Sequence, residues 1–273
     1  MDIKVRSLGS SSSGNSTLIW DEKDAFLIDF GFGPKYLKAR LKENNLDFSS
    51  IKGAALTHLH ADHCNAYTLR ELIKLNIPIY MHEENREHFL KRFHYIFFFD
   101  NVNLIQTFNG KGFDIGSFRF ENFEVPHDSE GVCSGFSIYN ESNSVIKKIT
   151  YATDVGCTES RMIDFFKNSD AVIIESNHDL TMLRRSRRPQ LLKDRISGSH
   201  GHLSNEQCSG FMMETFNASH KLPKGIILAH LSKECNTPAL AYRCFLNVLE
   251  QIGAPETKTY LARQFENSEL ITI

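Results

Sequence analysis

The chain has 273 residues, of which 41% are hydrophobic and 23% are charged, and its formal net charge is -2 at neutral pH. This composition predicts a well-buried interior, and we expect one domain over residues 1–273. The nearly balanced charge excludes a globally basic nucleic-acid-binding protein, so a polyanion would have to be attracted by local positive charge or by bound metal ions.

Cysteine usage and hydrophobicity indicate where the protein works. The six cysteines are scattered without C-x-x-C spacing, and the first residues lack the apolar stretch of a secretion signal, so we expect free thiols and a cytoplasmic location. The most apolar cluster, at 95–99, is far too short to span a membrane, which needs about 20 residues. We expect this cluster to lie in the core or at a subunit contact of a homo-oligomer.

The hydrophobic pattern predicts strands and helices in two successive blocks. The first block has predicted strands at 3–8, 16–20, 25–28, 53–57 and 77–81 and predicted helices at 34–42, 67–75 and 83–93. The second block is β-rich from 102 to 151, and it continues with predicted helices at 159–167, 181–194, 205–219 and 238–251 and predicted strands at 171–174 and 225–228. Two β-rich blocks, each followed by helices, favour two sheets packed face to face with helices outside.

A cluster of histidines follows the strand predicted at 53–57. Residues 57–63 read Thr-His-Leu-His-Ala-Asp-His, in a chain with only 12 histidines. His58 and His60 point to the same side of an extended segment, whereas Asp62 and His63 fall where the chain turns towards a helix. Imidazole and carboxylate are the ligands of zinc and, less selectively, of manganese or iron. The loop therefore predicts ligands for two metal ions, and a merely solvated loop does not explain the clustering.

Two ions need more ligands than this loop supplies. Three further candidates each stand directly after an apolar run, where a side chain leaves a strand for a loop: His127, Asp154 and His230.

The loop resembles the H-x-H-x-D-H motif of the metallo-β-lactamase superfamily. Further stretches are similar, in the same order, to the YycJ (WalJ) branch of that superfamily; they lie at 10–17, 26–31, 175–179, 201–205 and 229–233. The resemblance implies an α/β fold, the four-layer αββα sandwich, with the site between the two sheets at one edge. It also implies that Asp29 orients the histidine loop.

The resemblance further implies how the metal ligands are shared. His58, His60 and His127 would hold the first ion. Asp62, His63 and His230 would hold the second ion, and Asp154 would bridge the two.

Two such ions favour hydrolysis by a bridging hydroxide, which Asp62 helps to orient. A phosphodiester benefits most, because both its ground state and its transition state are anionic. The departing oxygen also needs a proton, for which His202 is the candidate donor. The arrangement resembles that of transfer-RNA 3′-processing members of the superfamily, in which a glutamate at the position of Glu175 polarises the histidine. The alternative is that His202 only begins a helix and Glu175 only forms a salt bridge.

The densest positive charge in the chain lies at 184–195, between Glu175 and His202. This location predicts a track for a phosphate backbone, although such runs also occur as solvated helix faces. We therefore assign Arg187 and Arg188 to substrate binding, together with His178 from the stretch that contains Glu175.

These features favour a metal-dependent hydrolase of ester bonds that acts on nucleic acid, and the YycJ resemblance implies a DNA exonuclease. The alternative is hydrolysis of a small cyclic phosphodiester, a lactone or a thioester, since fold does not decide the substrate. A redox di-iron protein is disfavoured because such relatives usually place glutamate where this chain has His60. A binding module that has lost its metal is disfavoured because every ligand position is filled.

Overall fold

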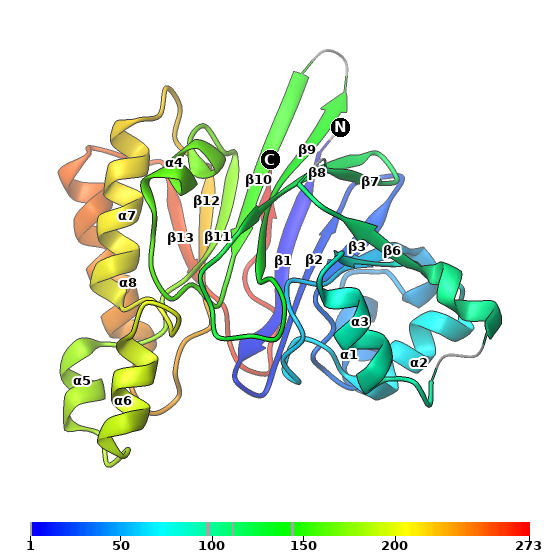
Figure 1. Cartoon of the computed structure of the whole chain (residues 1–273). Helices are drawn as coiled ribbons and strands as arrows, with labels where there is room; N and C mark the ends of the chain where they lie inside the picture. Colours follow the sequence, from blue (N-terminus) through cyan, green and yellow to red (C-terminus); the bar gives the residue numbers. More distant parts are fainter. Residues whose placement is uncertain (1, 97–98, 111, 143–144) are drawn as a thin grey trace.

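The computed structural model describes residues 2–96, 99–110, 112–142 and 145–273. Its strands form two seven-stranded sheets (Figure 1). The first sheet has the spatial order β14-β1-β2-β3-β4-β5-β6 and contains β1 (Lys4–Ser11), β2 (Gly14–Trp20), β3 (Ala25–Ile28), β4 (Ile51–Ala55), β5 (Ile79–His82), β6 (Ile105–Phe108) and β14 (Ile271–Thr272). The second sheet has the order β13-β12-β11-β10-β9-β8-β7 and contains β7 (Phe113–Ile115), β8 (Phe118–Glu124), β9 (Ser134–Ser142), β10 (Val145–Ala152), β11 (Ala171–Glu175), β12 (Gly225–Ala229) and β13 (Lys258–Leu261).

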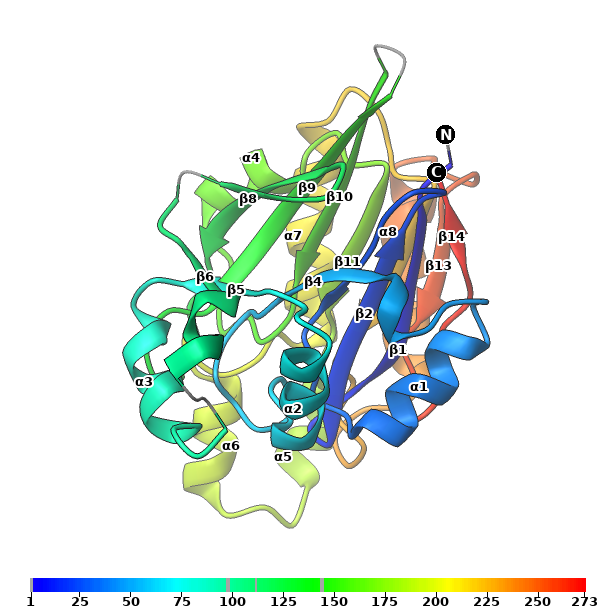
Figure 2. The ribbon, with the colours of Figure 1, turned by 90° about the vertical axis from the view of Figure 1, so that its right-hand side faces the viewer.

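Helices cover the outer face of each sheet (Figures 1 and 2). The first sheet packs against α1 (Pro34–Lys42), α2 (Ala66–Lys74) and α3 (Asn85–Arg92). The second packs against α4 (Ser160–Phe166), α7 (Asn205–Asn217) and α8 (Pro238–Gln251). The remaining helices are α5 (Leu180–Arg185), α6 (Gln190–Ser197) and the short 3-10 helices η1 (Phe48–Ser50) and η2 (Phe99–Leu104). The layer order confirms the predicted αββα sandwich.

The strands at the centre of each sheet are buried on both faces, which explains their continuous apolar runs. In β3, Phe26 packs between the two sheets, whereas its neighbour Leu27 packs beneath the helices. In β11, Ile173 packs between the sheets and Ile174 packs beneath the helices. Successive side chains of a strand point to opposite faces, so each strand contributes to two hydrophobic layers.

Several loops that carry polar residues leave the sheets at the same edge. Strands β3 to β6 run parallel to one another, as do β10 to β13. Parallel strands end at a common edge, so the loops after β4, β10 and β12 meet there. This edge holds the site described below.

The structure corrects the predicted elements at three places. The single helix predicted at 181–194 is wrong, because the chain forms α5 and α6 with a break at Ser186–Pro189, where Pro189 is the N-cap of α6. The strands β13 and β14 were not predicted; β14 pairs antiparallel with β1, opposite Lys4 and Val5.

The apolar cluster at 95–99 lies only partly within the described residues. Ile96 is buried and Tyr95 is 52% exposed, whereas Phe97 and Phe98 lie outside the described residues. Across the described ranges, no helix has both the length and the apolar character that crossing a membrane requires.

Candidate metal centre

The histidine loop connects β4 to α2 and is held at both ends. At its start, the backbone carbonyl of Thr57 accepts a hydrogen bond from the backbone of Ser134 in the second sheet, at 3.0 Å. At its end, the side chain of Asn65 caps α2 by accepting hydrogen bonds from the backbone of Tyr67 and Thr68. The loop is therefore fixed between the two sheets.

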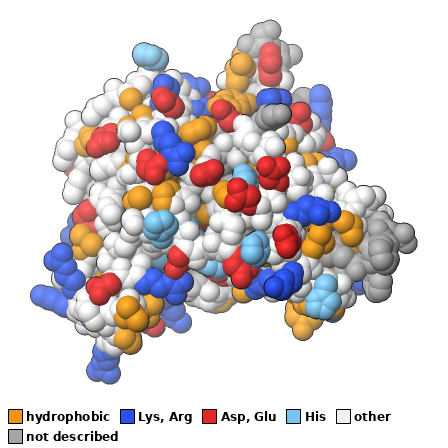
Figure 3. Space-filling model, viewed as in Figure 1, with side chains coloured by type: hydrophobic (Ala, Val, Ile, Leu, Met, Phe, Trp, Pro, Cys, Tyr) orange, Lys and Arg blue, Asp and Glu red, His pale blue; other side chains and the backbone are white. Residues whose placement is uncertain are grey.

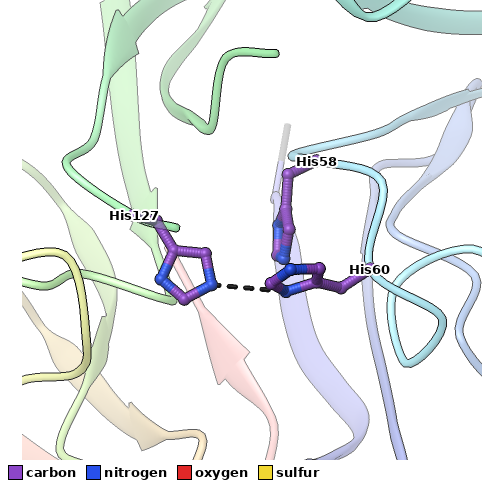
Figure 4. A group of neighbouring side chains, drawn as sticks. All are labelled: His58, His60 and His127. Atoms are coloured by element: carbon purple, nitrogen blue, oxygen red, sulfur yellow. Dashed lines mark hydrogen bonds between the residues drawn. The ribbon is translucent and has the colours of Figure 1, made fainter. Parts of the chain in front are cut away.

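The three predicted ligands of the first ion lie together. Ligand nitrogens of His58, His60 and His127 lie within 4.8 Å of one another (Figure 4). Nε2 of His127 is 3.3 Å from Nδ1 of His60. Nε2 of His58 is buried and has no hydrogen-bond partner among the described residues. Three imidazoles that converge from two sheets form a group that suits zinc.

The predicted ligands of the second ion form another such group. Oδ2 of Asp62 lies 3.6 Å from Nε2 of His63 and 3.8 Å from Nε2 of His230. Donors held tetrahedrally at zinc distances stand roughly 3.3–3.6 Å apart, so these spacings fit an ion.

Asp154 lies between the two groups. Its Oδ2 is 3.1 Å from Nε2 of His63, and its Oδ1 is 3.7 Å from Nε2 of His127. It is 2% exposed, and within the described residues its Oδ2 makes no hydrogen bond. This position is the one a bridging ligand would take.

The surroundings of His63 suit a cation. Its Nδ1 donates to Oδ2 of Asp29 at 2.7 Å, so Nε2 faces the carboxylates of Asp62 and Asp154. Two carboxylates and a ring nitrogen cannot approach so closely without a proton or a metal ion among them. The donor set therefore fits divalent metal ions.

Titration behaviour agrees with this picture. Burial lowers the pKa of His230, but the carboxylates of Asp154, Asp62 and Glu175 outweigh it and raise the pKa to about 10. Burial alone would raise the pKa of Asp154, yet His230 and His63 bring it well below its ordinary value. In the absence of metal, these carboxylates thus favour protonated imidazoles. The same attraction would favour a bound cation.

Asp29 orients the loop, as the resemblance implied. Its Oδ1 accepts from the backbone of Thr57 at 2.8 Å, and its Oδ2 accepts from His63. Its backbone dihedral angle φ is 60°, and those of Asp154 and His230 are similar, at 59° and 57°. The turn after Asp29 needs Gly31, because a Cβ there would lie 1.7 Å from the carbonyl oxygen of Asp62.

Glu175 joins the metal ligands to the predicted proton donor. One carboxylate oxygen lies 2.9 Å from Nδ1 of His202 and 2.7 Å from Nδ1 of His230. The other accepts from the backbone of Val155 and Leu203. Burial lowers the pKa of His202, but Glu175 outweighs it and raises the pKa above its ordinary value.

A cavity of about 230 Å³ opens over the predicted ligand cluster. His202, Arg188 and Arg195 line it together with the predicted ligands His60, Asp62, His127, Asp154 and His230. A second cavity of about 620 Å³ shares His60 and Asp128 with it and is lined by Lys91 and Arg92. Basic side chains thus border the cluster on two sides.

The predicted substrate-binding residues take different positions. Arg188 lines the metal cavity and pairs with Glu234 at 3.0 Å, whereas Arg187 is exposed and does not line it. His178 is buried away from the cavity, and burial lowers its pKa to about 4. Neither of its ring nitrogens has a hydrogen-bond partner among the described residues.

Arg195, which belongs to the predicted basic track, lines the cavity and forms an ion pair with Asp128 at 2.5 Å. Two residues near the predicted ligands had no predicted role: Ser10 and Asn15 lie beside the predicted ligands of the second ion. The serine-rich stretch at 10–17 had carried the resemblance, but nothing in its pattern indicated contact with a loop that follows some 45 residues later.

Comparisons with known proteins agree with the geometry. Residues 25–226 match the family model described as "Beta-lactamase superfamily domain". The chain belongs to this superfamily. Within the superfamily it is a YycJ-like protein: it is 30% identical over 260 residues to exodeoxyribonuclease YycJ of Bacillus anthracis, covering 93% of this chain and 91% of the relative. Exodeoxyribonuclease WalJ of Streptococcus pneumoniae is 31% identical over 248 residues, covering 91% and 88%. The fold is similar to that of the metallo-β-lactamase fold protein YhfI from Bacillus subtilis, with a TM-score of 0.70, 15% identity and full coverage of both chains.

Proposed function

We propose that this chain is a nuclease with two divalent metal ions, most simply zinc, that hydrolyses phosphodiester bonds of DNA. Hydrolysis of ester bonds with the help of metal is the coarser activity that its family and its donor cluster support. The names of its exodeoxyribonuclease relatives support DNA as the substrate and removal of nucleotides from an end.

The protein supplies the donors for both ions. His58, His60 and His127 would hold one ion; Asp62, His63 and His230 would hold the other; and Asp154 would contact both. When bound, such ions lower the pKa of a water towards neutrality and neutralise charge on a phosphate. We assign to Asp62 the further role of accepting a hydrogen bond from the attacking water.

The pairing of His202 with Glu175 is the observation that carries the proposal beyond metal binding. Glu175 pairs with Nδ1 of His202 at 2.9 Å, so Nε2 is the ring nitrogen that remains for the substrate. The ring lines the metal cavity and is 23% exposed. A protonated His202 would therefore donate a proton to the oxygen that leaves the phosphorus.

The basic side chains around the cavity favour a polymeric substrate. Lys and Arg side chains gather over α5 and α6, at the lower left of Figure 3. Of these, Arg188 and Arg195 reach the metal cavity, and Lys91 and Arg92 of α3 line the adjoining one, where Asp128 and Glu130 stand among them. Basic side chains on both sides of the cluster suit a phosphate backbone that extends past the cleaved bond. We retain Arg187 as a proposed contact of the substrate, whereas His178, which is buried away from the cavity, would contribute only by supporting the residues around it.

The substrate assay compares 5′- and 3′-labelled duplex DNA with a small chromogenic phosphodiester, a lactone and a thioester, after the metal content of the protein has been measured. We expect release of nucleotides from one end of the DNA and much slower turnover of the small substrates. Turnover of a small substrate with intact DNA would instead favour the alternative hydrolase.

The role of His202 is tested by His202→Ala. We expect retained metal and a fall in DNA turnover of at least about 10²-fold, which is typical for the loss of a general acid. His200→Ala is the matched control, because His200 is an exposed neighbour whose ring contacts Ser199. Undiminished turnover in His202→Ala would remove the proton-donor role.

A further inference from the structure

Two polar residues of the β1–β2 hairpin contact the ligands of the second ion. Asn15 is 1% exposed, and its Nδ2 lies 3.3 Å from Oδ2 of Asp62 and 3.0 Å from Nε2 of His63. Oγ of Ser10 accepts a hydrogen bond from the backbone of His230 at 2.9 Å. These two side chains thus reach all three proposed ligands of the second ion.

The amide of Asn15 can take only one orientation. Its Oδ1 faces the backbone N–H of Ser11 at 3.1 Å, and its Nδ2 faces the backbone carbonyl of Ser11 at 3.0 Å. Exchanging the two atoms would place donor against donor and acceptor against acceptor. The hydroxyl of Ser10 then donates to Oδ1 of Asn15 at 2.8 Å. The hairpin backbone therefore aims the N–H groups of Asn15 at the ligands.

The number of N–H groups on Asn15 fits an arrangement in which His63 binds an ion. Its amide nitrogen has two hydrogens but faces three acceptors: the carbonyl of Ser11, Asp62 and His63. If Nε2 of His63 binds an ion, the two hydrogens serve Ser11 and Asp62, and each group is satisfied. The same residue is fastened to the loop through its backbone, whose N–H donates to the carbonyl of Asp62 at 2.7 Å.

The backbone of His230 is held by the same network. His230 has φ 57°, a conformation that a histidine rarely adopts and that its surroundings must stabilise. The N–H of His230 donates to Ser10, and its carbonyl accepts from Nδ2 of Asn177 at 2.7 Å. Loss of the Ser10 hydroxyl would leave a buried N–H without its acceptor.

We infer that Asn15 and Ser10 are positioning residues of the second ion site, which hold Asp62, His63 and His230 in register for a divalent cation. The first site, formed by His58, His60 and His127, does not depend on them, since none of the hydrogen bonds recorded for Asn15 or Ser10 within the described residues goes to those histidines. The inference rests on the two-ion centre proposed above, and it assigns to the hairpin the selective support of one ion.

The test is zinc binding by the full-length Asn15→Leu variant, measured by chelator competition and elemental analysis. Leucine has nearly the size and shape of asparagine, but it donates no hydrogen bond to Asp62 or His63 and adds no carboxylate that could itself bind an ion. We expect one ion to bind as in the wild type and the dissociation constant of the other to rise about 10–100-fold, the usual effect of losing a partner of a metal ligand. Ser10→Ala is a milder change that should weaken binding of the same ion, and it serves as the test if Asn15→Leu fails to fold.

Asn85→Leu is the matched control. Asn85 is also fully buried and also bonds a neighbouring backbone, donating to the carbonyl of Val132 and accepting from its N–H. This variant should lose stability but keep both ions, which separates a positioning effect from a structural one.

The identity of the retained ion is established by second substitutions. In the Asn15→Leu background, His58→Ala should abolish the remaining tight binding, whereas His230→Ala should add little. A folded Asn15→Leu or Ser10→Ala protein that binds both ions with wild-type affinity, or that weakens both equally, overturns the inference alone. A wild type that binds only one ion refutes the two-ion centre and the inference with it.

Discussion

Three residues of the candidate metal centre have left-handed backbone conformations: Asp29, Asp154 and His230. A non-glycine residue with positive φ is uncommon, and aspartate tolerates it better than histidine does. Each follows a strand at the point where the chain must turn its side chain into the gap between the sheets. The strain is offset by hydrogen bonds, such as those from Thr57 to Asp29. The turn chemistry and the site chemistry therefore favour the same residue at Asp29 and Asp154.

The clustered donor side chains could be selected from the sequence because imidazoles and carboxylates carry chemistry of their own and stand directly after apolar runs, and the structure brings them together. Asn15 and Ser10 could not, because a serine or asparagine in a turn is common and its partner depends on sheet register. Nothing in the sequence shows that the loop after β4 reaches across the end of β3 to the β1–β2 hairpin, which places Asn15 against Asp62.

We expect Asp29→Asn to weaken the second ion and destabilise the fold. Asparagine tolerates the same φ and has the same shape, so the variant isolates the loss of a charged acceptor facing Thr57 and His63. A buried donor without an acceptor costs about 1–3 kcal/mol, and loss of a ligand's partner costs about 10–100-fold in metal affinity. Denaturant unfolding and zinc titration measure the two effects. An unchanged dissociation constant for both ions would contradict the orienting role of Asp29.

The α5–α6 pair is the part of the chain whose secondary structure was predicted least well from the sequence. The basic run at 184–195 contains enough helix-forming residues to suggest one helix, but Pro189 disfavours helical conformation in the residue before it. The chain therefore folds back, and a small cluster of Leu183, Ile196 and Cys235 packs the two helices together. The turn brings Arg188 to the metal cavity, and α6 brings Arg195 there.

We expect Arg188→Gln and Arg195→Gln to weaken DNA binding and to reduce the slope of log affinity against log salt by about one each, as the loss of a phosphate contact does. The same change at Arg187 tests whether the track extends beyond the cavity. Arg119→Gln is the control, because Arg119 is an exposed arginine that pairs with Asp114 on β7. Fluorescence anisotropy over a salt series measures the slopes, and equal slopes in all variants would argue against a phosphate track here.

At the scale of the whole molecule, each group of predicted ligands spans both sheets. The histidine loop follows β4 of the first sheet, whereas His127, Asp154 and His230 follow β8, β10 and β12 of the second. The pattern of strands and helices indicated mixed α and β structure, and the resemblance to the superfamily supplied the four-layer sandwich. It did not reveal β13 and β14, which are edge strands of four and two residues with exposed positions.

We expect removal of metal to lower the thermal stability of the entire fold, because ions that bind only the folded chain link one sheet to the other. At free zinc about 100-fold above the dissociation constant, one ion contributes about 2.7 kcal/mol, which corresponds to a Tm shift of roughly 5–10 °C in a chain of this size. Calorimetry with and without chelator measures the shift. His127→Ala should reduce it, and coincident unfolding curves with and without metal would contradict the linkage.

The pairing of β1 with β14 has a consequence for biosynthesis. The backbones of Ile3 and Ile273 exchange hydrogen bonds of 3.0 and 2.9 Å. The pairing partner of this early strand is therefore translated about 260 residues later. Until then, a nascent chain exposes one edge of β1 on the ribosome, where unpaired strands are prone to stick to other polypeptides. Holdase chaperones that shield such edges would therefore bind the segment that contains β1.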